Sequence, residues 1–224
     1  MPLRGTLAHH YLLIFALAVL CPSLTHSAQA HPHVWATVRS EIVFGPDGKI
    51  EAIRHAWTFD EFYTTMAVQG LDTDGDGAFS KEELQPLAQV NVESLKEFAY
   101  FTFVRIGKDE TSQPLKEPVD YWIDYSENAL TLHFTLPLAT PIEVKQKEVA
   151  VDVYDPSFFV AFGFATEAPV KLAGAASGCA AEIEKPDPEA EADAKALSEA
   201  FFSQLGPGSN FGSQFAQTAI VKCH

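Results

Sequence analysis

Two alternating runs on either side of a turn constrain the fold of this chain most strongly. The runs VWATVRSEIVF (Val34 to Phe44) and KIEAIRHAWTF (Lys49 to Phe59) both alternate apolar and polar side chains. Successive side chains of a strand point to opposite faces of a sheet, so this pattern is typical of β-strands. Gly45-Pro46-Asp47-Gly48 between them is a turn sequence. The sequence therefore predicts a β-hairpin over residues 34–59.

Further strand patterns outnumber helical ones along the rest of the chain. Helices are predicted over 60–71 with Asp60 as N-cap, over 81–98 with a break at Pro86, and over 187–205 with Asp187 as cap. We therefore expect an α+β fold, a mostly antiparallel sheet or sandwich with an inserted EF-hand-like helix-loop-helix and a C-terminal helix. The other predicted strands cover 100–107, 119–125, 129–138, 142–155, 157–164 and 215–223.

The first thirty residues have the parts of a secretory signal. Arg4 is followed by the apolar run from Tyr11 to Leu20 and then by the small-x-small pattern Ala28-Gln29-Ala30. We predict cleavage after Ala30, which leaves residues 31–224 as one exported domain. A retained anchor is the alternative, but the apolar run is too short to cross a bilayer of about 30 Å. We find no later apolar stretch of membrane-spanning length, so we do not expect an integral membrane protein after processing.

Charge and cysteine content narrow the classes of partner. The net charge is −15, which repels nucleic acid and anionic lipid and attracts cations. Cys179 and Cys223 remain after the predicted cleavage, and an even count in an exported protein indicates one disulfide. A thiolate metal site is the rival interpretation, but the two cysteines are far apart and form no CxxC motif.

The segment DTDGDGAFSKEE, from Asp72 to Glu83, matches the twelve-residue calcium loop of an EF-hand. Its predicted Ca²⁺ ligands are Asp72, Asp74, Asp76, the Ala78 carbonyl, Ser80 and Glu83. Gly77 stands where the loop must turn sharply. Since calcium-sensing EF-hands usually come in pairs and we find no second loop, we expect a structural calcium ion. A solvated acidic loop is the alternative.

Cleavage after Ala30 would leave His31 with a free amine beside its imidazole, and His33 would add a second imidazole. Imidazole suits Zn²⁺, Ni²⁺, Co²⁺ and Cu²⁺. Pro32 has no amide hydrogen, which excludes the copper-binding mode that uses the second amide. His133 and His55 are the internal candidates to complete such a site. Both also fit as ordinary sheet residues, and the terminus also fits a solvated start of the first strand.

Several segments together resemble a known family. The start HPHVW, then WTFDEFY, DTDGDG, VYDPSFFVAF and a C-terminal cysteine are similar to family 1007 of the domains of unknown function, exported proteins of Gram-negative bacteria. Its members are commonly labelled periplasmic components of uncharacterised ABC-type transport systems, often linked to metal transporters. The resemblance implies a periplasmic location and no established activity. The chain is shorter than ordinary two-lobed solute receptors, which favours an accessory role.

These observations lead to a functional hypothesis. We expect a periplasmic metal-handling accessory protein that is associated with an inner-membrane transition-metal transporter and carries one structural calcium ion. The alternative is a calcium-stabilised interaction module of a transport system, without transition-metal binding. We find no nucleophile elbow, HExxH motif or phosphate loop, so we do not expect an enzyme. Copper-dependent oxidation at the terminal histidines is the enzymatic alternative.

Overall fold

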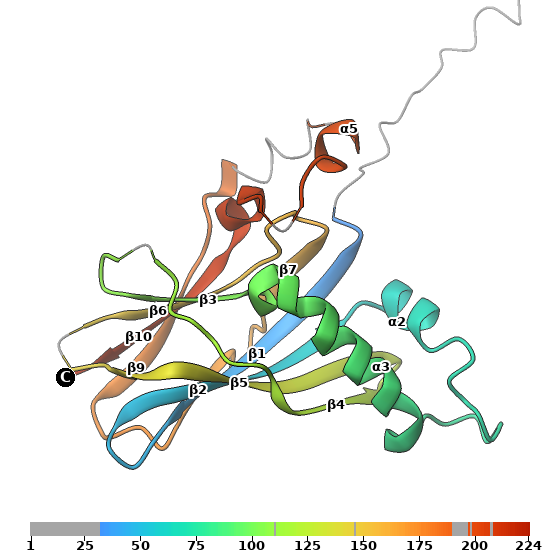
Figure 1. The fold of residues 1–224 in the computed structure, drawn as a ribbon, viewed down its shortest axis with the longest axis horizontal. Coiled ribbons are helices and arrows are strands. Elements are labelled where there is room, and N and C mark those ends of the chain that lie inside the picture. The colour runs from blue at the N-terminus through green and yellow to red at the C-terminus, as the bar shows by residue number, and fades with distance from the viewer. Residues whose placement is uncertain (1–31, 110, 146, 190–196, 198, 207) are drawn as a thin grey trace, which may run out of the picture.

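The computed structural model of the protein describes residues 32–109, 111–145, 147–189, 197, 199–206 and 208–224 (Figure 1). Most of its regular structure is β-strand, arranged in two sheets with a few helices. The α+β class expected from the sequence is therefore confirmed. The predicted cleavage site and His31 lie outside the described residues.

The larger sheet is built around the predicted hairpin. Its strands are ordered β4-β5-β2-β1-β7, and β8 also pairs with β1. The hairpin strands occupy the predicted ranges, and Val38 faces Trp57 in their antiparallel register. The bounds are β1 (Val34–Phe44), β2 (Lys49–Phe59), β4 (Val119–Ser126), β5 (Ala129–Glu143), β7 (Val160–Phe164) and β8 (Val170–Ala173).

The smaller sheet is antiparallel throughout and has the order β3-β6-β10-β9. The C-terminal strand β10 thus lies inside the sheet, between β6 and β9. Cys223 of β10 faces Cys179 of β9, and their sulfurs form the predicted disulfide. The bounds are β3 (Thr102–Ile106), β6 (Val149–Val153), β9 (Cys179–Glu184) and β10 (Gln217–Cys223).

Two layers cover the inner face of the larger sheet. At one end, Ile42 and Ile53 pack in one apolar cluster with Val151 and Val221 of the smaller sheet. At the other end, helix α3 (Lys81–Ser94) crosses the sheet, as Figure 1 shows. Its buried residue Leu84 belongs to a second apolar cluster. The apolar face of the hairpin is therefore buried at both ends, by the smaller sheet at one end and by α3 at the other.

The helices differ in length from the sequence prediction. Helix α2 spans Glu61–Ala67, and the Asp60 carboxylate caps it by accepting from the Tyr63 amide at 2.9 Å. Helix α3 runs through Pro86 without a break, because Leu84, Ala88 and Val92 hold it against the sheet on both sides of the proline. A 3-10 turn, η1 (Leu95–Phe101), follows α3.

The predicted C-terminal helix falls largely outside the described residues. Among those described, helix α5 covers Glu199–Phe202 and a 3-10 turn, η2, covers Phe211–Phe215. Residues 190–196 and 198 of that prediction are not described.

Two strand predictions are corrected by the structure. The single strand expected over 142–155 is divided between the end of β5 and β6. Strands β8 and β9 are not predicted, because β8 has only four residues and β9 (CAAEIE) is rich in alanine and glutamate, which are depleted in strands. The pairing is mostly antiparallel, as expected, and only β7 and β8 run parallel to β1 among the described strands. Among the described residues, no helix combines the length and the apolar character needed to cross a membrane.

Candidate functional site: an acidic loop between two helices

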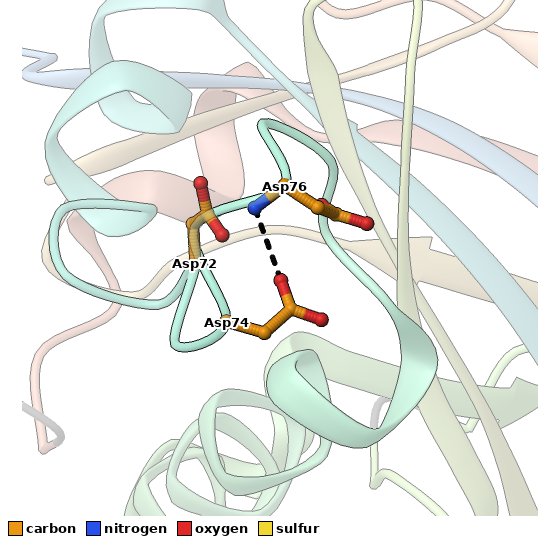
Figure 2. Close-up of side chains that lie close together, drawn as sticks. All are labelled: Asp72, Asp74 and Asp76. Carbon is orange, nitrogen blue, oxygen red and sulfur yellow. Dashed lines mark hydrogen bonds between the residues drawn. The ribbon is translucent and has the colours of Figure 1, made fainter.

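The predicted calcium loop connects α2 to α3 and brings three carboxylates together. Ligand oxygens of Asp72, Asp74 and Asp76 all lie within 4.8 Å of one another. Figure 2 shows the three side chains on one turn of the loop, and the Asp76 amide donates to the Asp74 carboxylate at 3.1 Å. Three like charges this close repel one another, so a cation among them would be favoured.

The loop backbone folds around these carboxylates. Asp72 accepts from the amides of Gly75 at 2.7 Å and Gly77 at 3.1 Å. Gly77 has a φ of +80°, a conformation that other residues rarely adopt. Asp76 accepts from the Ala78 amide at 2.7 Å. The spacing that predicted the loop thus also produces the turns that gather its side chains.

Glu83, the predicted closing ligand, lies outside this group of three. One of its oxygens accepts from the amide and hydroxyl of Thr73 at 2.7 and 2.8 Å. The other accepts from the amide and hydroxyl of Ser80 at 2.9 and 2.8 Å. The amide hydrogen bonds from Ser80 and Thr73 lower the pKa of Glu83 to about 2. Glu83 is therefore ionised at neutral pH, and it ties the start of the loop to its end.

Ser80 has a second role, as the N-cap of α3. The Ser80 hydroxyl accepts from the Glu83 amide, while the Glu83 carboxylate accepts from the Ser80 amide. This reciprocal pair is a capping box. The structure thus places Ser80 and Glu83 at the helix start, and it gives both side chains partners within the loop.

Aromatic contacts fix the loop to the edge strand β4. The ring of Phe79, at the eighth position of the loop, packs edge-on against Tyr125 with centroids 4.9 Å apart. Lys81 lies over the ring of Trp122 at 5.3 Å. The two flanking helices are linked by the Tyr63 hydroxyl, which donates to Asn91 at 3.3 Å. Movement of the loop is therefore coupled to the sheet and to both helices.

The four candidate histidine ligands have different surroundings. His31 is not described. The exposed residue His33 has its amide bonded to the Phe159 carbonyl at 2.9 Å and its ring 4.9 Å from the Phe159 ring. His55 is buried, with Nδ1 2.9 Å from the Ser40 hydroxyl and Nε2 3.2 Å from the Thr102 hydroxyl. Both nitrogens of His55 therefore have hydrogen-bond partners.

His133 also lies apart from His33. Its cross-strand partner in β2 is Ala56, which in turn faces Arg39 in β1. Arg39 is six residues beyond His33, and six residues of extended chain span about 20 Å. The structure thus does not bring His33, His55 and His133 into one group.

A contact that the sequence analysis missed involves His133. Its Nε2 is 2.6 Å from the Asp124 carboxylate, and its ring stacks on Trp122 at 4.6 Å and 5°. The residues Glu127 and Asn128 turn the β4–β5 hairpin with φ of 52° and 60°. Recognition of this two-residue turn would have fixed the register and placed Trp122 opposite His133.

A second missed residue is Asp155, in the segment VYDPSFFVAF. Its buried carboxylate accepts from the amides of Ser157, Phe159 and Val160 at 2.8 to 3.0 Å and from the Ser157 hydroxyl. These bonds shape the entry to β7. The sequence Asp-Pro-Ser is a turn signal, but its burial is set by packing that the sequence does not show.

Fold and site together define a two-sheet α+β protein with an acidic helix-loop-helix against one sheet edge. The model of the family described as "Protein of unknown function (DUF1007)" matches residues 15–223, so the chain belongs to this family. The resemblance inferred from HPHVW and the other segments is confirmed.

Two relatives are similar to this chain. An uncharacterized protein of Haemophilus influenzae is 24% identical over 196 residues, which cover 87% of this chain and 91% of the relative. An uncharacterized 15.5 kDa protein in the trpE 3′ region of Spirochaeta aurantia is 31% identical over 105 residues. That match covers 47% of this chain and 73% of the relative.

Proposed function

We propose that this chain is a periplasmic accessory protein that handles transition-metal ions beside an inner-membrane metal transporter. In this proposal, a single Ca²⁺ ion in the loop from Asp72 to Glu83 has a structural role. The observation that supports the calcium site best is the gathering of three carboxylates on a loop with EF-hand spacing.

A structural role for the ion follows from the contacts of the loop. In paired EF-hands, two loops stabilise each other, whereas here Phe79 packs on Tyr125 of a β-strand. An ion bound by Asp72, Asp74 and Asp76 would cancel their repulsion and hold α2 and α3 in place on the sheet. The calcium form would then be the working form of the protein, with no switching required.

Thermal unfolding with calcium and with chelator tests this site. Isolated extracellular sites have Kd values of about 10⁻⁴ to 10⁻³ M. At 10 mM Ca²⁺ this affinity stabilises the folded state by about 1.4 to 2.7 kcal/mol, which raises Tm by roughly 3 to 10 °C for a domain of this size. Asp72→Asn should abolish the shift. The control Glu182→Gln removes one exposed charge from β9 and should keep it. An equal shift in both variants would refute the site.

The transition-metal part of the proposal depends on the processed terminus. His33 supports it because its side chain is exposed while its backbone is bonded to Phe159, so a ligand there would have a defined position. The amine and imidazole of His31 would complete a chelating group. Zn²⁺, Ni²⁺, Co²⁺ or Cu²⁺ would then be bound at the start of the mature chain.

Calorimetric titration of the processed protein with Zn²⁺, Ni²⁺, Co²⁺ and Cu²⁺ tests this part. We expect the double variant His31→Ala, His33→Ala to lose binding and His224→Ala to retain it. A form with one extra Met before His31 keeps both imidazoles but displaces the amine, and it should bind more weakly. Binding that is equal in all four proteins would rule out the terminal site.

Exposed apolar side chains favour a second candidate function, the calcium-stabilised interaction module. On α2, Phe62 and Met66 are 74% and 55% exposed, and they lie one turn apart on the helix. Trp35 is 53% exposed, and its backbone amide donates to the carboxylate of Asp60, the N-cap of α2. Under this alternative, capture of a transporter component should need calcium and should fail for Phe62→Ser, Met66→Ser. It should not depend on His31 or His33.

A further inference from the structure

A hollow of about 430 Å³ lies beside the start of β3, away from the acidic loop. It is bounded by η1, by β3 and by the segment that leads to β4, with Tyr100, Phe103 and Leu115 among its apolar walls. Small-molecule sites have volumes of roughly 300 to 1,000 Å³. This hollow is near the lower end of that range, so it suits a ligand smaller than a typical cofactor.

One wall of the hollow is a strained turn. Ala99, Tyr100 and Phe101 have φ of 53°, 55° and 48°, so three successive non-glycine residues are left-handed. This conformation costs about 1 to 2 kcal/mol for each residue. Such strain persists where the surrounding structure enforces it, and it concentrates at ligand sites.

The buried core enforces this turn through a chain of hydrogen bonds. The Thr102 hydroxyl donates to the Tyr100 carbonyl at 2.9 Å. Since that hydroxyl has one hydrogen, the contact at 3.2 Å with His55 requires Nε2–H of His55 to donate to Thr102. His55 Nδ1 then accepts from Ser40. The hydrogen bonds of His55, a residue of the larger sheet, thus hold Thr102, and Thr102 holds the backbone of Tyr100 in the wall of the hollow.

The rim of the hollow carries one positive and one negative group. Lys96 of η1 and Glu117 of the segment before β4 are the charged residues that line it, and their side chains are 2.5 Å apart. Both side chains are mostly exposed, and such ion pairs contribute about 0 to 1 kcal/mol. A ligand that brings its own carboxylate and ammonium can therefore replace the pair at little cost.

We propose that this hollow binds a free α-amino acid with an apolar side chain. The carboxylate and the ammonium of such a ligand stand on one carbon atom, so they can meet the adjacent Lys96 and Glu117 together. The side chain then enters the space beside Tyr100, Phe103 and Leu115. A ligand with a single charge would leave one rim group unpaired, which makes the site selective for the zwitterion.

Calorimetric titration of the processed protein with L-leucine and L-phenylalanine tests the proposal. We expect binding of at least one of them and no binding of N-acetyl-L-phenylalaninamide, which carries neither charge. Lys96→Gln and Glu117→Gln should each weaken binding about two- to fivefold, because each removes one exposed ion pair with the ligand. The control Lys222→Gln breaks a comparable exposed pair with Glu148 and should bind as the parent does.

Three outcomes would overturn the proposal: no binding of either amino acid at millimolar concentration, equal binding of the capped compound, or unchanged affinity in both rim variants. The rim side chains are exposed, so these substitutions leave the core intact. The titration requires neither calcium nor a transition metal, so its failure would not bear on the proposed metal sites.

Discussion

Protonation of His55 should set the acid stability of this protein. The His55 ring joins the two sheets, since it bonds to Ser40 of β1 and to Thr102 of β3. Burial lowers the pKa of His55 from its ordinary value of 6.5 to about 3. Between these values the unfolded chain binds a proton on His55 and the folded protein does not. The contribution of neutral His55 to the free energy of unfolding is therefore complete above about pH 6.5, and it is lost as the pH falls towards 3.

The size of this effect follows from the two pKa values. Between pH 7 and pH 5, the titration of His55 in the unfolded chain alone lowers the free energy of unfolding by about 2 kcal/mol. Carboxylates also contribute to acid sensitivity, so the parent protein must be compared with a variant that lacks only this titration. His55→Gln serves this purpose, because its amide can still donate to Thr102 but does not titrate.

Urea denaturation of both proteins at pH 7 and pH 5 provides the measurement. We expect the loss of unfolding free energy between the two pH values to be about 2 kcal/mol smaller in His55→Gln than in the parent. The variant will also be less stable at pH 7, since it loses ring packing against Trp57 and Phe134. An equal pH dependence in the two proteins would refute the assignment of a buried, neutral His55.

Three further predictions concern stability. Replacing Cys179 and Cys223 by serine opens a link across 44 residues, and it should cost about 4 kcal/mol in denaturant unfolding by the chain-entropy model; reductant should then leave the stability of the variant unchanged. Gly212→Ala should cost about 3 kcal/mol or more, because its Cβ would stand 1.7 Å from the Asp155 carbonyl oxygen, whereas Gly208→Ala has open space and should cost little. Arg105→Met should cost about 3 kcal/mol in the same assay, because the buried Asp152 carboxylate would lose both of its guanidinium hydrogen bonds.

The hairpin of β1 and β2 was predictable because its alternation and its turn are local signals. The same holds for the cap at Asp60 and for the turns around Gly77, where residue type and backbone conformation are directly linked. In these places, the sequence pattern is caused by the geometry of the element itself.

The unpredicted features depend on contacts between distant segments. Nothing in the residue types of Ala99, Tyr100 and Phe101 favours a left-handed turn. The turn is held by the adjacent Thr102, whose hydroxyl is bonded in turn to His55 of the larger sheet. For the same reason, the sequence leaves His55 as a candidate metal ligand, whereas in the structure its two nitrogens are bonded to Ser40 and Thr102. The hollow beside this turn has no sequence signature at all.

The position of β10 has a consequence for the order in which the smaller sheet can form. Strand β10 follows β6 and β9 in the sequence, yet it lies between them and pairs with both. Until β10 has been synthesised, β6 can pair only with β3, and β9 lacks its partner in the smaller sheet. Removal of β10 would therefore leave one edge of β6 and one edge of β9 without a partner strand, and such exposed edges are prone to aggregation.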